Sequence, residues 1–295
     1  MTRTILRALA AACAWALIAA PAHAAGNEAE MKAAFEAADK VKVVGPASVS
    51  LRDQAMLKLP AGNIYIPMPQ AGRLMQAMGN RRDERLLGIV LPQSDFGWFV
   101  AIKFIQEGFV QDNDAKDWKA DELLKSLREG TEAANNERTQ RGFPALEVVG
   151  WAEPPKYDAG MHRLVWSASA REKGASGNQP QAVNYNTYAL GRDGYMSLNL
   201  ITDLTSLDKH RPAALQLLEG LDYNDGKRYA DFNKSTDKVA AYGLAALVAG
   251  VAAKKLGLIA LFLAFAAKFA KVLVVAGGAA LYGLSKMFGR KKTEA

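Results

Sequence analysis

The feature that most constrains this chain is a long apolar stretch near its C-terminus, from Val239 to Leu284. It is divided into apolar runs of 15, 12 and 12 residues by four lysines: Lys254, Lys255, Lys268 and Lys271. As one helix the stretch would measure roughly 70 Å at about 1.5 Å per residue, more than the hydrocarbon thickness of a bilayer. The simplest prediction is a membrane region over residues 236–285 that contains two helices.

The lysines and the basic tail leave the topology of this region open. Residues 286–295 carry four basic side chains and prefer the cytoplasmic side, which favours a single span with another run lying at the interface. Lysines inside a membrane segment are costly and usually face a polar interior. Small residues spaced four apart, such as Ala246 and Gly250, permit close helix contact. A simple alanine-rich anchor is the favoured interpretation of this spacing, and the alternative is a homo-oligomer or protein partner through the C-terminal helices.

The N-terminus is typical of a secretory leader. Arg3 and Arg7 precede a short apolar run, and a small-x-small pattern ends at Ala24. We predict a cleaved signal peptide over residues 1–24, with an uncleaved anchor as the alternative. The single cysteine, Cys13, lies inside this leader, so the mature chain would lack disulfides and thiolate metal sites.

The positive charge of the chain belongs mainly to its membrane end. Residues 25–235 contain 26 Lys and Arg against 28 Asp and Glu, a net charge of −2, although the whole chain carries +7. A nucleic-acid-binding domain would concentrate basic residues in its folded part. We therefore expect no nucleic acid partner.

Residues 25–235 predict an α+β domain with a mainly antiparallel sheet and flanking helices, because strand patterns occur in runs rather than alternating with helices. Asp193-Gly194 predicts a hairpin, and the strand within 97–105 should be central. The first three strands are expected to form a small meander. The expected helices are 25–40, 69–78, 117–141 and 206–219, and the expected strands are 47–51, 55–59, 63–67, 86–91, 97–105, 146–152, 161–170, 183–190 and 195–202.

Few side chains in this domain suggest chemistry. His162 shares its alternation with Leu164 and Trp166, so a structural histidine at the end of an apolar strand face is favoured over a catalytic base. His210, at a helix start, should be solvated. Three tyrosines near the predicted hairpin are ordinary strand positions or line a ligand cleft: Tyr185, Tyr188 and Tyr195. No zinc, phosphate-loop or dinucleotide motif occurs, so no metal or cofactor is expected.

Several segments together resemble a known family. They are Trp151 to Tyr157, His162 to Trp166, Val183 to Tyr185, Leu190 to Gly194, Gly226 to Tyr229, and Asp237 to Gly243 followed by an alanine-rich span. This combination resembles the bacterial membrane-anchored family catalogued as domain of unknown function 2167. The resemblance implies a signal peptide, an extracytoplasmic domain and C-terminal membrane helices. It implies no activity, cofactor or catalytic residue.

The leading hypothesis is a membrane-anchored envelope protein of the inner membrane, whose domain in the periplasm or outside the cell acts as a binding or interaction module. We favour this hypothesis because the sequence carries signals for export and anchoring but no catalytic motif. One alternative is an envelope hydrolase or transferase that uses carboxylates with His162. Another is a subunit of a membrane transport assembly, with the four lysines in its interior. An enzyme is the less favoured class, and the bilayer is the expected partner.

Overall fold

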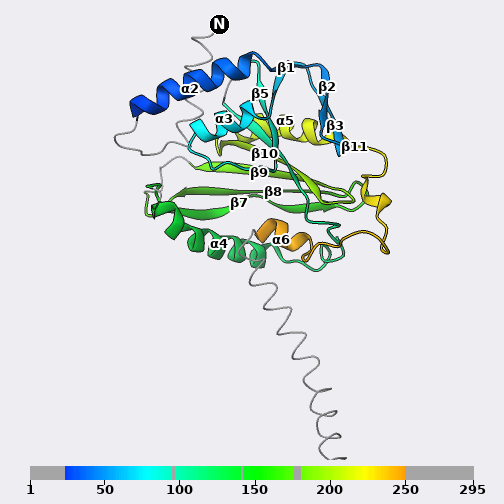
Figure 1. The fold of residues 1–295 in the computed structure, drawn as a ribbon. Coiled ribbons are helices and arrows are strands. Elements are labelled where there is room, and N and C mark those ends of the chain that lie inside the picture. Colours follow the sequence, from blue (N-terminus) through cyan, green and yellow to red (C-terminus); the bar gives the residue numbers. More distant parts are fainter. Residues whose placement is uncertain (1–23, 95–96, 141, 176–180, 250–295) are drawn as a thin grey trace, which may run out of the picture.

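A computed structural model of the chain describes residues 24–94, 97–140, 142–175 and 181–249 (Figure 1). The predicted leader, the basic tail and residues 250–285 of the predicted membrane region lie outside the described residues. The first described helix, α2 (Ala24–Asp39), coincides with the amphipathic helix predicted after the leader. Within the described ranges, no helix has both the length and the apolar composition that crossing a bilayer requires.

The domain is built on an eight-stranded antiparallel sheet in the order β1-β4-β5-β6-β10-β9-β8-β7. Flanking helices complete an α+β fold, as the sequence predicts. The strands of this sheet are β1 (Val43–Val44), β4 (Asn63–Pro67), β5 (Leu86–Pro92), β6 (Phe99–Ile105), β7 (Leu146–Asp158), β8 (Arg163–Glu172), β9 (Ala182–Leu190) and β10 (Tyr195–Asp203).

The centre of the sheet carries the most apolar strands. Every residue of β5 is buried, and in β6 only Lys103 retains partial exposure. Strands covered on both faces read as near-continuous apolar runs, because neither face meets water. The predicted central position of β6 is therefore confirmed, and Asp193-Gly194 joins β9 to β10 as a hairpin.

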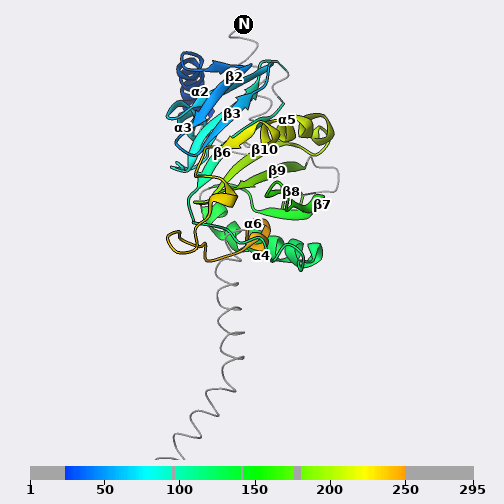
Figure 2. The same cartoon turned by 90° about the vertical axis from the view of Figure 1, so that its right-hand side faces the viewer.

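Helices and a second sheet cover the two faces of the large sheet (Figures 1 and 2). On one face, α5 (Leu207–Glu219) and the small sheet close a core that contains Val100 and Leu198. The other face has two cores. One lies under α2 and α3 (Gln70–Ala77) and contains Phe99; the other lies against α4 (Ala120–Gln140) and α6 (Leu244–Ala249) and contains Trp166.

The predicted meander of the first three strands is wrong at its third member. β2 (Ala47–Leu51) and β3 (Ala55–Leu59) pair with each other, and β11 (Leu221–Tyr223) pairs with β3 in a three-stranded sheet. β4 instead enters the large sheet between β1 and β5. Its residues Tyr65 and Ile66 are buried in cores on opposite faces, which only a strand within the large sheet achieves.

Candidate functional site

His162 lies in the turn between β7 and β8, one residue before the strand in which it was predicted. Its backbone φ is +52°, in the left-handed region that non-glycine residues rarely occupy. The side chain retains 30% of its exposure. Strained backbone of this kind persists where surrounding contacts hold it, and it concentrates at functional sites.

Two side chains from distant parts of the chain meet the His162 ring. Tyr157, near the end of β7, donates its hydroxyl to Asp112 Oδ2 at 2.7 Å. His162 Nδ1 lies 3.3 Å from the same carboxylate oxygen and 3.2 Å from the Tyr157 hydroxyl. The ionised Asp112 carboxylate can only accept hydrogen bonds, and the Tyr157 hydroxyl already donates its proton to Asp112. The proton between the ring and these two oxygens therefore belongs to His162 Nδ1. In the neutral ring, Nε2 is then the acceptor.

The charge of Asp112 is maintained by its hydrogen bonds. Burial raises the pKa of Asp112, but hydrogen bonds, led by the one from Tyr157 and joined by His162, outweigh burial and hold that pKa below its usual range. Burial, followed by the hydrogen bond to Asp112, raises the pKa of Tyr157, so the phenol remains a donor. We call Asp112, Tyr157, His162 and Tyr229 the His162 cluster.

A column of aromatic rings supports this cluster from one side. The His162 ring stacks on Tyr229 with 4.0 Å between centroids, and Phe109 lies 4.3 Å beyond Tyr229. Phe232 stacks on Phe109 at 3.8 Å. Tyr229, in the short 3-10 helix η1 (Tyr229–Asp231), also donates its hydroxyl to the carbonyl of Val110 at 3.0 Å. Stacking and hydrogen bonding together orient the imidazole ring.

Residues 233–243, which we call the strap, lie beside this cluster and lead into α6. Asp237 forms a two-point ion pair with Arg192 at 2.7 and 2.8 Å. The strap also pairs with Phe109, whose N–H donates to the Lys238 carbonyl and whose carbonyl accepts from Ala240 N–H, both at 2.8 Å. These contacts attach the strap to the β9–β10 hairpin and to the loop after β6.

Asp114 joins the loop that holds Asp112 to the start of α6. Its two carboxylate oxygens accept the backbone N–H groups of Leu244 and Ala245, each at 3.1 Å. An acidic side chain suits a helix N-terminus because the first backbone N–H groups lack helical partners. Gly243 makes the approach possible, since a Cβ there would lie 2.4 Å from Asp114 Oδ2.

The folded domain therefore extends beyond residue 235, where the sequence places its boundary. Ala240 and most of α6 are buried in the core against α4: Leu244, Leu247, Val248 and Ala249. The predicted membrane region thus begins with residues that pack on the sheet domain. The polar sites predicted in that region, Lys254, Lys255, Lys268 and Lys271, lie outside the described residues.

The three candidate tyrosines do not share one surface. Tyr185 is 1% exposed and belongs to the core under α5. Tyr188 points to the opposite face, where its ring meets Tyr195 edge-on at 5.5 Å. Strand alternation separates positions 185 and 188, because side chains three residues apart in a strand point to opposite faces. The structure brings together two of the three, within a core.

The prediction that His210 is solvated is wrong. His210 is 4% exposed, and its Nδ1 lies 2.7 Å from the hydroxyl of Thr202 on β10. A polar helix sequence suggested solvent, but α5 turns this position toward the sheet beside Trp98. The buried histidine therefore has a structural hydrogen bond inside the domain.

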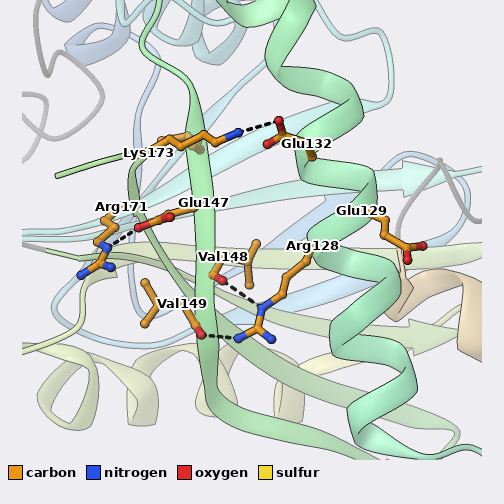
Figure 3. Close-up of a pocket in the computed structure, with 9 residues that line it drawn as sticks. Arg128, Glu129, Glu132, Glu147, Val148, Val149, Arg171 and Lys173 are labelled. Atoms are coloured by element: carbon orange, nitrogen blue, oxygen red, sulfur yellow. Dashed lines mark hydrogen bonds and ion pairs between the residues drawn. The ribbon is translucent and has the colours of Figure 1, made fainter. Parts of the chain in front are cut away.

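A groove of about 550 Å³ lies between α4 and the edge strand β7 (Figure 3). Arg128 spans it and donates to the carbonyls of Val148 and Val149. Lys173 pairs with Glu132, and Arg171 pairs with Glu147, both at 2.6 Å. Asn135 also exchanges two hydrogen bonds with the backbone of Leu146. The side chains of α4 thus occupy backbone groups of an edge strand that could otherwise pair with another chain.

Sequence reasoning identified His162 but missed its partners. Asp112, Tyr157 and Tyr229 lie 50, 5 and 67 positions away along the chain, without a shared motif. Two of them, Tyr157 and Tyr229, end segments that carry the family resemblance. Among the described residues, no group of three His, Cys, Asp or Glu side chains could hold a metal ion.

Comparison with known proteins places the chain in a family. A solution structure of cyanobacterial PsbP (CyanoP) from Synechocystis sp. PCC 6803 is similar at a TM-score of 0.37 and 8% identity, covering 62% of this chain and 91% of that chain. No curated protein matches the chain. The family model described as "Protein of unknown function (DUF2167)" matches residues 43–278, from β1 through the strap and past α6. The chain therefore belongs to the DUF2167 family.

Proposed function

We propose that this protein is a membrane-anchored envelope protein whose folded domain binds a partner outside the cytoplasm. The leader-like N-terminus and the apolar C-terminal sequence support export and anchoring. The observation that carries the proposal is the attachment of α6 to the domain. The helix α6 lies near the start of the apolar stretch, Asp114 caps it, and most of its apolar side chains are buried.

This junction sets how the domain would be presented at the bilayer. A flexible linker would let a tethered domain rotate freely. Here the strap and α6 are held by an ion pair, backbone pairing and a buried core. The domain would therefore face the membrane with one defined end, as a binding module with a fixed orientation does.

Membrane fractionation tests the anchoring part of this proposal. The full chain should remain in the membrane pellet after alkaline carbonate washing. A matched truncation after Ala249 retains all of α6, so it should keep its fold and be released from the membrane. Protease added to spheroplasts should digest the domain in the full chain. Protection of the domain, or release of the full chain by carbonate, would contradict the proposal.

Site-specific photo-crosslinking tests the binding part. A crosslinker at Ala159, which is exposed in the turn before His162, should give a discrete adduct in cells. A crosslinker at Met56, which is 37% exposed on β3, serves as the control position. Equal adducts at both positions, or none at either, would argue against a binding surface near the His162 cluster.

A second candidate, an envelope hydrolase or transferase, is favoured by one observation at the same cluster. His162 Nδ1 lies 3.3 Å from an ionised carboxylate, an arrangement that orients Nε2 as a proton acceptor. The test uses p-nitrophenyl acetate and p-nitrophenyl phosphate with the purified full chain. Turnover should vanish in His162→Gln, fall in Asp112→Asn and persist in Met161→Ala. Turnover that all three variants retain would eliminate this candidate.

A further inference from the structure

Exposed apolar and basic side chains gather around the strap. Val239 is 40% exposed and Met161 is 56% exposed, although both are large apolar residues. Phe232 remains partly exposed, and Lys234 and Lys238 are exposed. We call these five residues the strap patch: Met161, Phe232, Lys234, Lys238 and Val239.

The backbone segments that carry the strap patch come together around Phe109. Phe232 stacks on the Phe109 ring, and Val239 pairs with Phe109 as an isolated parallel bridge. On the other side of Phe109, Tyr229 stacks on His162, the residue after Met161. Segments more than 120 residues apart along the chain are thereby held in one corner of the domain.

The charge of this patch is positive. Asp237 lies between the two lysines in sequence, but its carboxylate is engaged by Arg192 and by the backbone N–H of Asn233. Neither Lys234 nor Lys238 has an ion pair among the described residues. Apolar side chains beside uncompensated lysines suit an anionic lipid surface, where the apolar groups enter the interface and ammonium groups meet headgroups.

The position of the patch points to the same partner. The strap precedes α6, which ends at Ala249, and the apolar sequence continues directly from there. In Figures 1 and 2 the strap lies beside α6 at the lower end of the domain, whereas β2 lies at the upper end. If residues 250–285 enter a bilayer, the surface next to α6 is the part of the domain nearest to it.

We propose that the strap patch contacts the surface of the bilayer that holds the C-terminal region. Met161, Phe232 and Val239 enter the interface, and Lys234 and Lys238 pair with anionic headgroups. The inference rests on the proposed membrane anchoring. It adds a second contact between domain and membrane, which would hold the His162 cluster close to the lipid.

Fluorescence quenching in reconstituted membranes tests this contact. The full chain with Cys13→Ala and Val239→Cys would carry an environment-sensitive dye in vesicles of phosphatidylcholine and phosphatidylglycerol. A spin-labelled lipid should quench the dye several-fold more at position 239 than at Val44→Cys. Val44 is a matched control because it is 46% exposed on β1, at the far end of the sheet. The same measurement with a dye at Met161→Cys tests the patch at a second position, in case the substitution of Val239 disturbs the local structure.

Charge reversal completes the test. Lys234→Glu with Lys238→Glu should reduce quenching at position 239 several-fold, and so should vesicles of phosphatidylcholine alone. Quenching at 239 equal to that at 44, in protein that floats with the vesicles, would overturn the strap patch while leaving the anchor intact. Failure to float would instead reject the anchor. Protein crosslinking at 239 without lipid quenching would assign the patch to a protein partner and would also overturn the proposal.

Discussion

Arg192 and Asp237 form a two-point ion pair at 2.7 and 2.8 Å that ties the strap to the β9–β10 hairpin. The hydrogen bond from Arg192 is the main reason that the pKa of Asp237 lies well below its usual range. The pair joins residues 45 positions apart and fixes the strap through side chains, in addition to its backbone pairing with Phe109. Loss of this ion pair should first increase the mobility of the chain between η1 and α6.

Asp237→Asn should therefore loosen the strap while leaving the sheet folded. The amide retains hydrogen-bonding capacity but loses the charge that Arg192 binds. Limited trypsin digestion of the full chain should cut after Lys234 or Lys238 several-fold faster than in the wild type. Arg73→Ala, which removes a surface ion pair with Glu30, is the control. Unchanged cleavage in Asp237→Asn would mean that backbone pairing alone holds the strap.

Gly108→Ala should destabilise the domain by about 2 kcal/mol, because strain and a clash act together. Gly108 has a φ of +95°, and an added Cβ would lie 2.5 Å from the Lys238 carbonyl oxygen. Gly62→Ala is a matched control, since its φ is +79° and nothing lies within 4 Å of its Cβ. Urea unfolding measures both. Equal losses of stability in the two variants would show that only the positive φ is unfavourable. The contact between the new Cβ and the Lys238 carbonyl would then have no measurable effect.

Thr202→Val should destabilise the domain by about 1–3 kcal/mol, because the buried His210 Nδ1 loses the hydroxyl that it meets at 2.7 Å. The substitution nearly preserves side-chain volume, so the change reports the hydrogen bond more than packing. Thr205→Val, at an exposed position after β10, should change the free energy of unfolding much less. A near-zero effect of Thr202→Val in thermal unfolding would contradict a structural role for this hydrogen bond.

Asp83 should make stability depend on acid pH. The hydrogen bond from Arg85, opposed by burial and aided by Lys103, holds the pKa of Asp83 well below its usual range. The folded pKa thus lies below the unfolded value of about 3.9, so the contribution is present above about pH 4 and is lost as pH falls further. Asp83→Asn should cost under about 1 kcal/mol at pH 7.

Urea midpoints at pH 7 and pH 3 check this dependence. The difference between wild type and Asp83→Asn should shrink at the lower pH. Asp117→Asn, an exposed change before α4, should leave the pH dependence as in the wild type. If the difference in urea midpoint between wild type and Asp83→Asn is the same at both pH values, Asp83 does not contribute to the loss of stability in acid.

Local patterns predicted most elements because each depends on nearby residues. The run of apolar residues in β6 and the Asp193-Gly194 turn each specify an element without help from distant segments. The local pattern does not predict which strand pairs with which. β4 has the same local signature as β2 and β3, and only its burial on both faces places it in the large sheet.

The sequence by itself determined the antiparallel α+β design, the family resemblance and the concentration of positive charge at the C-terminal end. Periodicity, turn residues and composition are local properties, so they can be read along the chain. Only the tertiary structure decided that Asp112 and Tyr157 meet His162, that His210 is buried, and that α6 belongs to the folded domain. Each of these depends on contacts between distant segments, which form when burial of apolar surface brings those segments together.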